Sequence, residues 1–256
     1  MKRYRKPYRI KKKKSILKSR LFWRVVLGLV FAGVSFYFFL FSPIFRIKKI
    51  NISGNEDILT QDIKKIITDE MFAEYGDNVF LFGSLKIKNT LLGIYPKISK
   101  LELRRIFPDT LRVAIEERKS VAIFSQGDEL FSLDKEGIIF ENASDKLGLI
   151  TVRSNSTELK DIGGKVLEDN IISSILTIGS KLKDDFKIAI EEVLAASNER
   201  LNIKTDEGWE IYFDPTQDLN WQITKLKAVL EQEISPDRRK SLQYIELRFG
   251  NLASYK

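Results

Sequence analysis

The sequence predicts an α+β protein with a single N-terminal transmembrane helix, a compact domain of element order β-α-α-β-β, and a second mixed β-rich domain with two helices. Three observations support this prediction. One uncharged apolar run lies near the N-terminus, short runs of alternating apolar and polar residues recur through the rest of the chain, and two late segments repeat apolar residues at helical spacing. Alternation favours half-buried strands, and helical spacing favours amphipathic helices.

The apolar run predicts a transmembrane helix over residues 21–42. Val25 to Phe41 is seventeen residues without a charge, and Leu21 to Trp23 extend the apolar stretch to twenty-one residues around Arg24. At about 1.5 Å per residue this stretch spans about 30 Å, the thickness of the hydrocarbon core of a bilayer. A cleaved signal peptide is the alternative, but its apolar core is shorter and its cleavage site has small residues, whereas this run exits through bulky ones.

The charge distribution predicts the orientation of that helix. The chain has 43 basic and 35 acidic residues, a net charge of +8, but residues 1–24 hold twelve basic residues and no acidic one. The positive-inside rule therefore predicts a basic cytoplasmic tail over residues 1–20 and an extracytoplasmic remainder, as in a single-pass type II protein of the cell (inner) membrane. The tail, with Tyr4 and Tyr8 among its cations, also suits a nucleic-acid arm. We favour a topology determinant that contacts membrane lipid, with no nucleic-acid partner.

The chain contains no Cys and no His. It therefore lacks a disulfide, a thiolate nucleophile, an imidazole base and every nitrogen or sulfur metal ligand, which excludes zinc enzymes and Ser-His-Asp hydrolases. Carboxylates, Lys and hydroxyls remain for chemistry, with oxygen-only Mg²⁺ or Ca²⁺ sites. We expect no metal and no cofactor.

The first extracytoplasmic domain follows directly. A strand is predicted from Phe45 to Ile52, closed by the turn Ser53-Gly54-Asn55. Two helices follow, one with Thr60 as N-cap and the other with Ser84 as N-cap. Two alternating runs, 98–106 and 111–115, flank the turn at 107–110 and lead to Glu116-Glu117-Arg118. The apolar face of the first helix is predicted to comprise Leu59, Ile63, Ile66, Ile67 and Met71, and that of the second Leu85, Ile87, Leu91 and Leu92.

The second domain reads as strands punctuated by two helices. Strands are predicted near 121–124, 130–133, 138–140, 149–152, 190–194, 200–205, 209–213 and 243–249. Two helical stripes separate them, and Pro236 is expected to end the second helix. The stripes are Ile171, Ile175, Ile178 and Leu182, and then Leu219, Ile223, Leu226 and Leu230.

Four short motifs carry a family resemblance. They are Ser53-Gly54-Asn55, Tyr95-Pro96-Lys97-Ile98, the run from Arg104-Arg105-Ile106-Phe107-Pro108 to Leu111, and Glu117-Arg118. Their order and spacing resemble the POTRA domain of the bacterial FtsQ/DivIB cell-division proteins, and the layout of tail, anchor, POTRA domain and β-rich lobe is also that of this family. The resemblance implies a POTRA domain at 45–118, an FtsQ-type β domain at 119–250 and a C-terminal tail at 251–256.

The resemblance also implies a function. Proteins of this family are non-enzymatic membrane scaffolds of the division complex, found at the septum, that link early and late division proteins and support septal wall synthesis. It further implies binding of FtsB- and FtsL-like bitopic proteins, with FtsK as a candidate partner of the first domain and no small-molecule substrate.

The last predicted strand is the expected partner-binding site. A terminal strand can lie at a sheet edge, where its free backbone groups accept a partner strand. The resemblance identifies the same strand as the docking surface, although Glu246 and Phe249 stand where the family commonly has Asp and Tyr. The expected partner-binding residues are Leu247, Arg248, Phe249, Asn251 and, from the preceding hairpin, Arg200.

Two alternatives compete with the scaffold. A membrane-anchored cell-wall hydrolase would need two carboxylates about 5 to 9.5 Å apart, with candidates Glu116, Glu117, Asp134 and Glu136. Each has an ordinary role at a strand end or in a turn, so no catalytic residue is expected. A surface glycoprotein is suggested only by acceptor triplets, which arise often by chance. They begin at Asn51, Asn142 and Asn155.

Overall fold

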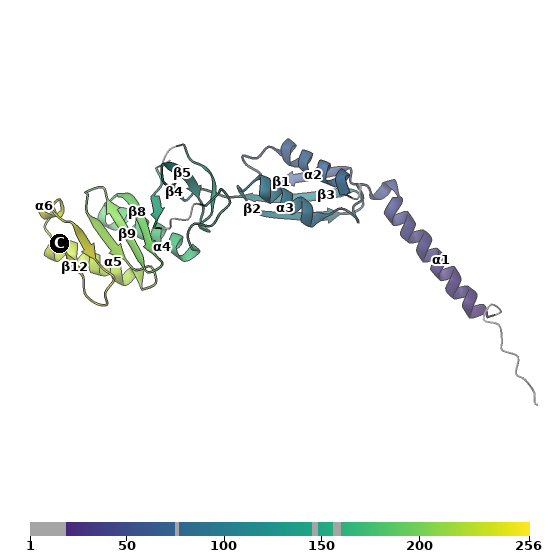
Figure 1. The fold of residues 1–256 in the computed structure, drawn as a ribbon. Coiled ribbons are helices and arrows are strands. Elements are labelled where there is room, and N and C mark those ends of the chain that lie inside the picture. The colour runs from purple at the N-terminus through teal and green to yellow at the C-terminus, as the bar shows by residue number, and fades with distance from the viewer. Residues whose placement is uncertain (1–18, 75–76, 145–147, 156–159) are drawn as a thin grey trace, which may run out of the picture. The chain divides into compact units, whose positions relative to one another are not determined.

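The computed structural model describes residues 19–74, 77–144, 148–155 and 160–256 (Figure 1). The predicted basic tail therefore lies outside the described residues, apart from its last two, and so do Ser156 and Thr157 of the third acceptor triplet. The chain divides into two compact units. The first unit takes residues 1–53, 58–88 and 102–114, and the second takes 54–57, 89–101 and 115–256.

The first described element confirms the predicted apolar helix. Helix α1 runs from Arg20 to Phe41, and none of its residues is buried. It is long and apolar enough to cross a membrane. The predicted strand begins later than Phe45, because Pro43–Phe45 form a 3₁₀ turn, η2, in which the Ile44 N–H donates to the Ser42 hydroxyl at 3.3 Å.

The predicted β-α-α-β-β order is confirmed. Strand β1 (Lys49–Ser53) is followed by helices α2 (Thr60–Glu74) and α3 (Ser84–Ile94), and then by β2 (Ile98–Ile106) and β3 (Thr110–Glu117). The sheet order is β1-β3-β2, with β1 parallel to β3 and Lys49 opposite Thr110. A parallel pair needs a long crossover, which the two helices and β2 provide.

The buried face of α2 is narrower than predicted. Ile63, Ile67 and Met71 are buried, whereas Leu59 is 67% exposed and Ile58 is buried in its place. Leu59 precedes the helix, and its carbonyl accepts the N–H of Ile63 at 3.3 Å. Because its carbonyl accepts this first helical bond, Leu59 is the N-cap, one residue earlier than the predicted Thr60, and its exposed side chain lies outside the buried face.

The second unit is built on a nine-stranded sheet of order β12-β11-β10-β9-β8-β7-β4-β5-β6 (Figure 1). Every predicted strand region contains a strand; β9 has the predicted ends and the others have shifted ends. The strands are β4 (Ala122–Gln126), β5 (Glu129–Leu133), β6 (Ile139–Asn142), β7 (Thr151–Ser154), β8 (Ile190–Ser197), β9 (Arg200–Thr205), β10 (Glu210–Phe213), β11 (Tyr244–Glu246) and β12 (Ser254–Tyr255).

The two predicted helices cover the core of this sheet. Helix α4 (Asp169–Lys181) and helix α5 (Leu219–Ala228) each continue into a π-helical turn, η3 (Leu182–Phe186) and η4 (Val229–Glu233). Ile171, Ile175, Ile178 and Leu182 are buried as the spacing predicts. The second helix ends before Pro236, which opens the short helix α6 (Pro236–Arg239), consistent with the preference of Pro for the first helical turn.

The C-terminal end differs from the prediction. Only Tyr244–Glu246 of the predicted strand 243–249 form β11, and the predicted tail 251–256 folds back, so that Ser254–Tyr255 form β12 antiparallel to β11. Gly250, with φ of 46°, helps the chain reverse, and the Leu252 N–H donates to the Phe249 carbonyl at 3.0 Å. The outer edge of β11, expected to be free, is occupied by the protein's own chain.

Candidate partner-binding site

One face of strands β9, β10 and β11 carries a cluster of arginine, tyrosine and glutamate. Tyr212 of β10 lies between Asn202 and Glu246 in the strand register, so residues two apart along each strand share this face. We call Arg200, Tyr212, Tyr244, Glu246 and Arg248 the outer-face cluster. The opposite face of the same strands is buried, as Leu201, Ile203, Ile211 and Ile245 show.

Ring contacts and charge hold the outer-face cluster together. The Arg200 guanidinium lies 4.8 Å from the centre of the Tyr212 ring, and the Tyr212 and Tyr244 rings stack at 5.4 Å. Arg248 donates from Nε and Nη2 to the Glu246 carboxylate at 2.9 and 2.6 Å. The predicted residues Arg200 and Arg248 are therefore brought onto one face.

Protonation in this cluster follows from these contacts. Burial would raise the pKa of Glu246, but the hydrogen bonds and charge of Arg248 outweigh burial and hold that pKa below its usual value. Burial, together with a hydrogen bond to Glu210, raises the pKa of Tyr212. At neutral pH the cluster thus presents ionised Glu246, two arginines and neutral tyrosine.

A buried lysine positions the turn that follows β11. Lys225 of α5 is 6% exposed, and its Nζ donates to the carbonyls of Leu247, Gly250 and Leu252 at 2.5, 2.9 and 3.3 Å. Burial lowers the pKa of this amine. The sequence reasoning missed Lys225. The available signal was its position next to the buried stripe of α5, three residues after Gln222, which is 1% exposed.

A second contact fixes the same turn from the loop before α5. The Gln217 side chain donates to the Arg248 carbonyl at 3.0 Å and to Asp214 at 2.6 Å. Gln222 accepts the Asp214 N–H at 2.9 Å and donates to the Asp214 carbonyl at 2.8 Å. The turn at 247–252 is therefore an ordered feature held by α5 and by the loop that precedes it.

The predicted partner-binding residues differ in exposure. Phe249 is 63% exposed, with the Arg248 guanidinium 5.1 Å from its ring centre, and Asn251 is also exposed. Arg200 is half-buried. Leu247 is fully buried in the core, so its side chain presents nothing to a partner in this structure. Two exposed apolar residues that the sequence reasoning missed, Leu252 and Tyr255, accompany Phe249.

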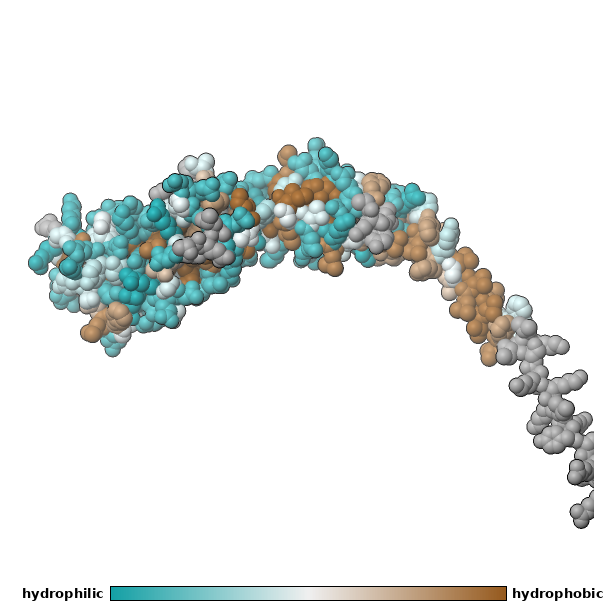
Figure 2. All heavy atoms as spheres, in the orientation of Figure 1, coloured by the Kyte–Doolittle hydropathy of each residue, from teal (hydrophilic) through white to brown (hydrophobic). Residues whose placement is uncertain are grey.

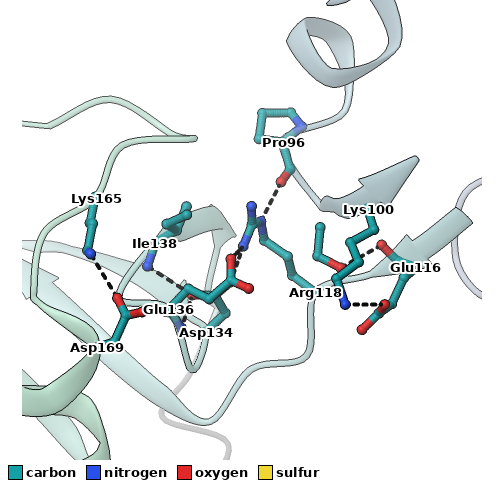
Figure 3. Close-up of polar contacts among 10 residues, drawn as sticks. Pro96, Lys100, Glu116, Arg118, Asp134, Glu136, Ile138, Lys165 and Asp169 are labelled. Carbon is teal, nitrogen blue, oxygen red and sulfur yellow. Dashed lines mark hydrogen bonds and ion pairs between the residues drawn. The ribbon is translucent and has the colours of Figure 1, made fainter. Parts of the chain in front are cut away.

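The candidate catalytic acids gather in a different place. Figure 3 shows Arg118 between the Pro96 carbonyl and the carboxylates of Asp134 and Glu136. The Asp134 side chain is 4% exposed, and its other oxygen accepts the N–H groups of Glu136 and Ile138, each at 2.9 Å. Asp134 thus closes the β5–β6 turn and pairs with a nearly buried arginine.

The two remaining acids also hold structure. The Glu117 carboxylate accepts the backbone N–H groups of Glu56 and Asp57 at 2.7 and 3.1 Å, and Glu116 pairs with Lys100 at 3.2 Å. A hollow of about 400 Å³ is lined by all four acids, together with Arg118 and Lys119. Each of the four carboxylates therefore accepts hydrogen bonds that hold a turn or takes part in an ion pair, which is a structural role.

Gly54 explains one of the family-like motifs. Its φ is 85°, and a Cβ there would lie 2.1 Å from the Ile115 carbonyl oxygen. Only glycine fits so close to this backbone in that conformation. The turn Ser53-Gly54-Asn55 therefore requires its central residue.

An apolar N-terminal helix of membrane-spanning length, a POTRA-type domain and a β-rich domain together define the class of POTRA proteins with an N-terminal apolar helix. Residues 45–118 match the FtsQ-type POTRA domain, and residues 122–248 match the C-terminal domain of cell division protein FtsQ/DivIB. The chain belongs to the FtsQ/DivIB family of cell-division proteins, as the sequence motifs indicated.

Individual relatives agree with this assignment. The chain is 27% identical over 124 residues to cell division protein DivIB of Clostridium acetobutylicum, a match covering 48% of this chain and 47% of the relative. It is 24% identical over 221 residues to DivIB of Staphylococcus aureus, covering 83% of this chain and 46% of the relative. It is 22% identical to FtsQ of Neisseria gonorrhoeae over 88% of this chain and 85% of the relative.

The relatives support a role in bacterial cell division. The matched segments span slightly less than half the length of the two DivIB proteins. Among the described residues, α1 is the one helix long and apolar enough to cross a membrane, and with the family membership it fits a single-pass membrane protein of the division machinery.

Proposed function

We propose that this protein is a non-enzymatic scaffold of the division complex that works by binding. Its tail at 1–20 lies in the cytoplasm, α1 crosses the membrane, and the domains at 45–118 and 119–250 lie outside, at the septum. There it binds a small FtsB- or FtsL-like bitopic protein and so supports septal wall synthesis, while the first domain takes part in recruitment, with FtsK as the candidate partner. The twelve basic residues of 1–24, a segment with no acidic residue, lie at the N-terminal end of the apolar run and support this orientation.

One observation carries the binding proposal. The turn at 247–252 exposes the apolar side chains of Phe249 and Leu252 although it is anchored by the buried Lys225 and by Gln217. A rigid turn with Phe249 and Leu252 exposed, beside an arginine and tyrosine cluster, has the composition of an interface hot spot. Pre-organisation of the turn lowers the entropy lost when a partner binds.

The partner is proposed to add as a strand in place of β12. Strand β12 has two residues, and both are exposed. Its ladder with β11 pairs two residues, Tyr255 with Ile245 and Ser254 with Glu246. Lys256, which follows β12, accepts the Gln243 N–H at 2.6 Å and donates to the Tyr244 carbonyl at 3.1 Å. A longer partner strand would form more ladder bonds to β11 than β12 does.

Capture of the partner from solubilised membranes tests this proposal. Phe249→Glu places a charge on the exposed ring position and should strongly reduce capture of the bitopic partner by the full-length protein. Phe72→Glu is the matched control, because Phe72 is 70% exposed and lies in the other unit. Unchanged capture by Phe249→Glu would refute the assignment of Phe249, and equal loss in both variants would show a non-specific effect of charge.

The hydrolase alternative has its own test. Asp134, Glu136 and Glu117 hold turns and an arginine, which favours the scaffold. Cleavage of purified wall polymer by the full-length protein, abolished by Asp134→Asn with folding retained, would instead establish the hydrolase.

A further inference from the structure

The C-terminal end of α1 is joined to the first unit by side-chain hydrogen bonds. Asn78 is 5% exposed, and its Nδ2 donates to the carbonyls of Phe39 and Leu40 at 3.2 and 2.7 Å. The last four carbonyls of a helix have no partner within the helix, so Asn78 satisfies two groups that would otherwise need water. The helix therefore ends in a bonded junction with the loop before α3.

The backbone strengthens this junction. The Val79 N–H donates to the Phe45 carbonyl at 2.8 Å, and the Ile47 N–H donates to the Asp77 carbonyl at 2.6 Å. Arg46, between them, forms a bridge with Asn78. Only η2 separates α1 from this bridge, so the loop at 77–82 is fixed at the level where α1 ends.

Four phenylalanine rings extend from the helix across the end of the unit. The Phe39 and Phe45 ring centres are 5.2 Å apart, those of Phe45 and Phe80 are 5.2 Å apart, and those of Phe80 and Phe107 are 5.1 Å apart. Phe39 belongs to α1, and Phe107 lies in the turn between β2 and β3. The rings thus connect the apolar helix to the tip of the sheet.

These rings belong to an exposed apolar surface that continues from α1, which we call the junction patch. Its members Ile44, Phe80, Leu81 and Phe107 are 51%, 36%, 41% and 57% exposed. Figure 2 shows apolar surface running along α1 and onto the adjoining end of the first unit. Such a surface is unfavourable in water unless something covers it.

The position and charge of the junction patch point to lipid. Helix α1 has 22 residues, about 33 Å at its rise per residue, so when it spans the hydrocarbon core its last turn lies at the interface. Aromatic rings are enriched at that level. The exposed cations Arg46, Lys48 and Lys49 follow η2, with Asp77 paired to Arg46 at 3.6 Å, and their sign suits anionic headgroups.

We propose that the junction patch is a lipid-binding surface that seats the first unit in the interfacial layer of the bilayer. Phe80, Leu81 and Phe107 enter this layer beside the end of α1, and the bonded junction holds them there. The proposal rests on the membrane anchoring of α1.

The absence of cysteine from the chain makes the test clean, because a single introduced thiol is the only labelling site. Full-length variants Leu81→Cys, Leu59→Cys and Val30→Cys carry a nitroxide in vesicles of phosphatidylethanolamine and phosphatidylglycerol. Leu59 is the matched control, because it is 67% exposed and precedes α2, whose opposite end leads to Asp77. At 15 residues, α2 places Leu59 about 22 Å from that end.

The measurement is relaxation enhancement by a water-soluble nickel chelate compared with oxygen. The label at Leu81 should be shielded from nickel several-fold more than the label at Leu59, and Phe107→Asp in the Leu81→Cys background should restore its accessibility. A label at Leu81 that is as accessible as that at Leu59, with Val30 shielded, would overturn the lipid contact while the anchor stands. An accessible label at Val30 would overturn the anchor and the proposal together. Phe72→Asp in the Leu81→Cys background is the charge control and should leave the label at Leu81 shielded. If the label at Leu81 stays equally shielded in Phe107→Asp, the proposed lipid contact of the junction patch is also overturned.

Discussion

Replacing Lys225 with methionine should release the turn at 247–252. The variant keeps the aliphatic length of the side chain but removes the three hydrogen bonds to the carbonyls of Leu247, Gly250 and Leu252. Gly250 and Leu252 are exposed, so water can replace the ammonium at their carbonyls. Leu247 is fully buried, so its carbonyl loses a partner that water cannot easily replace.

The magnitude follows from that difference. One unsatisfied buried carbonyl costs about 1 to 3 kcal/mol, whereas the two solvated carbonyls add little. Removing the ammonium also relieves its desolvation, the cause of its lowered pKa, so the net loss should lie near the lower end of that range. The loss should be local to the turn and to β12, which follows it in the chain.

Hydrogen exchange of the full-length protein in detergent measures this effect. In Lys225→Met the amides of Leu247, Leu252 and Lys256 should exchange faster, while those of β8 and β9 stay protected. Lys227→Met is the control, because Lys227 lies on the same helix, is exposed, and pairs only at 3.9 Å with Glu231. Unchanged exchange at 247–256 in Lys225→Met, or equal changes in both variants, would refute the anchoring role of Lys225.

Three further predictions concern stability. Arg118→Met leaves the carboxylate of Asp134 buried without its cation and should lower the free energy of unfolding by about 3 to 5 kcal/mol. The control Lys119→Met removes an exposed ion pair and should lower it by less than about 1 kcal/mol. Urea titrations monitored by tryptophan fluorescence measure both values. Gly137→Ala would put a Cβ 1.9 Å from the Leu167 carbonyl oxygen and should lower the free energy of unfolding by about 3 kcal/mol or more. Gly127→Ala, also at positive φ but with open space around the Cβ, should lower it by about 1 to 2 kcal/mol. Similar losses for the two variants in the same titration would contradict the steric argument. The pKa of Glu246 is lowered in the folded state, so its contribution to stability is present above its unfolded pKa of 4.5 and is lost as the pH falls through its folded pKa. In Glu246→Gln the melting temperature should therefore fall less steeply with decreasing pH below 4.5 than in the unmodified protein. An unchanged slope would show that Glu246 does not contribute to the acid sensitivity.

The sequence identified the elements whose signal is local. Seventeen uncharged residues were sufficient to predict α1, and the apolar stripe from Ile171 to Leu182 was sufficient to predict α4. In both cases the signal lies within the segment itself, as length and hydrophobicity for α1 and as helical spacing of apolar residues for α4. The β-α-α-β-β order followed from patterns of the same kind. The family motif around Gly54 also has a local cause, since the backbone there requires glycine.

The parts that were missed depend on distant partners. Strand β12 has two residues and exists because β11 offers it a ladder, so no periodicity in 251–256 could reveal it. Lys225 was missed because a lysine in a helix is ordinarily solvated, and only the carbonyls of a turn more than twenty residues later make its burial favourable. Leu247 was predicted as a partner contact from its place in the terminal strand and from the family resemblance, and neither tells which face of the strand the core covers; in the folded sheet its side chain is buried.

The most direct test of the proposed binding role is site-specific photo-crosslinking in growing cells. The full-length protein would carry p-benzoyl-phenylalanine at Phe249, with the same residue at Phe72 as the control, since both positions are exposed and aromatic. The proposal predicts a crosslink from position 249 to a small FtsB- or FtsL-like bitopic protein and none from position 72. Absence of that crosslink at 249, with the variant protein present at normal level and still supporting division, would contradict the assignment of this turn as the partner-binding surface.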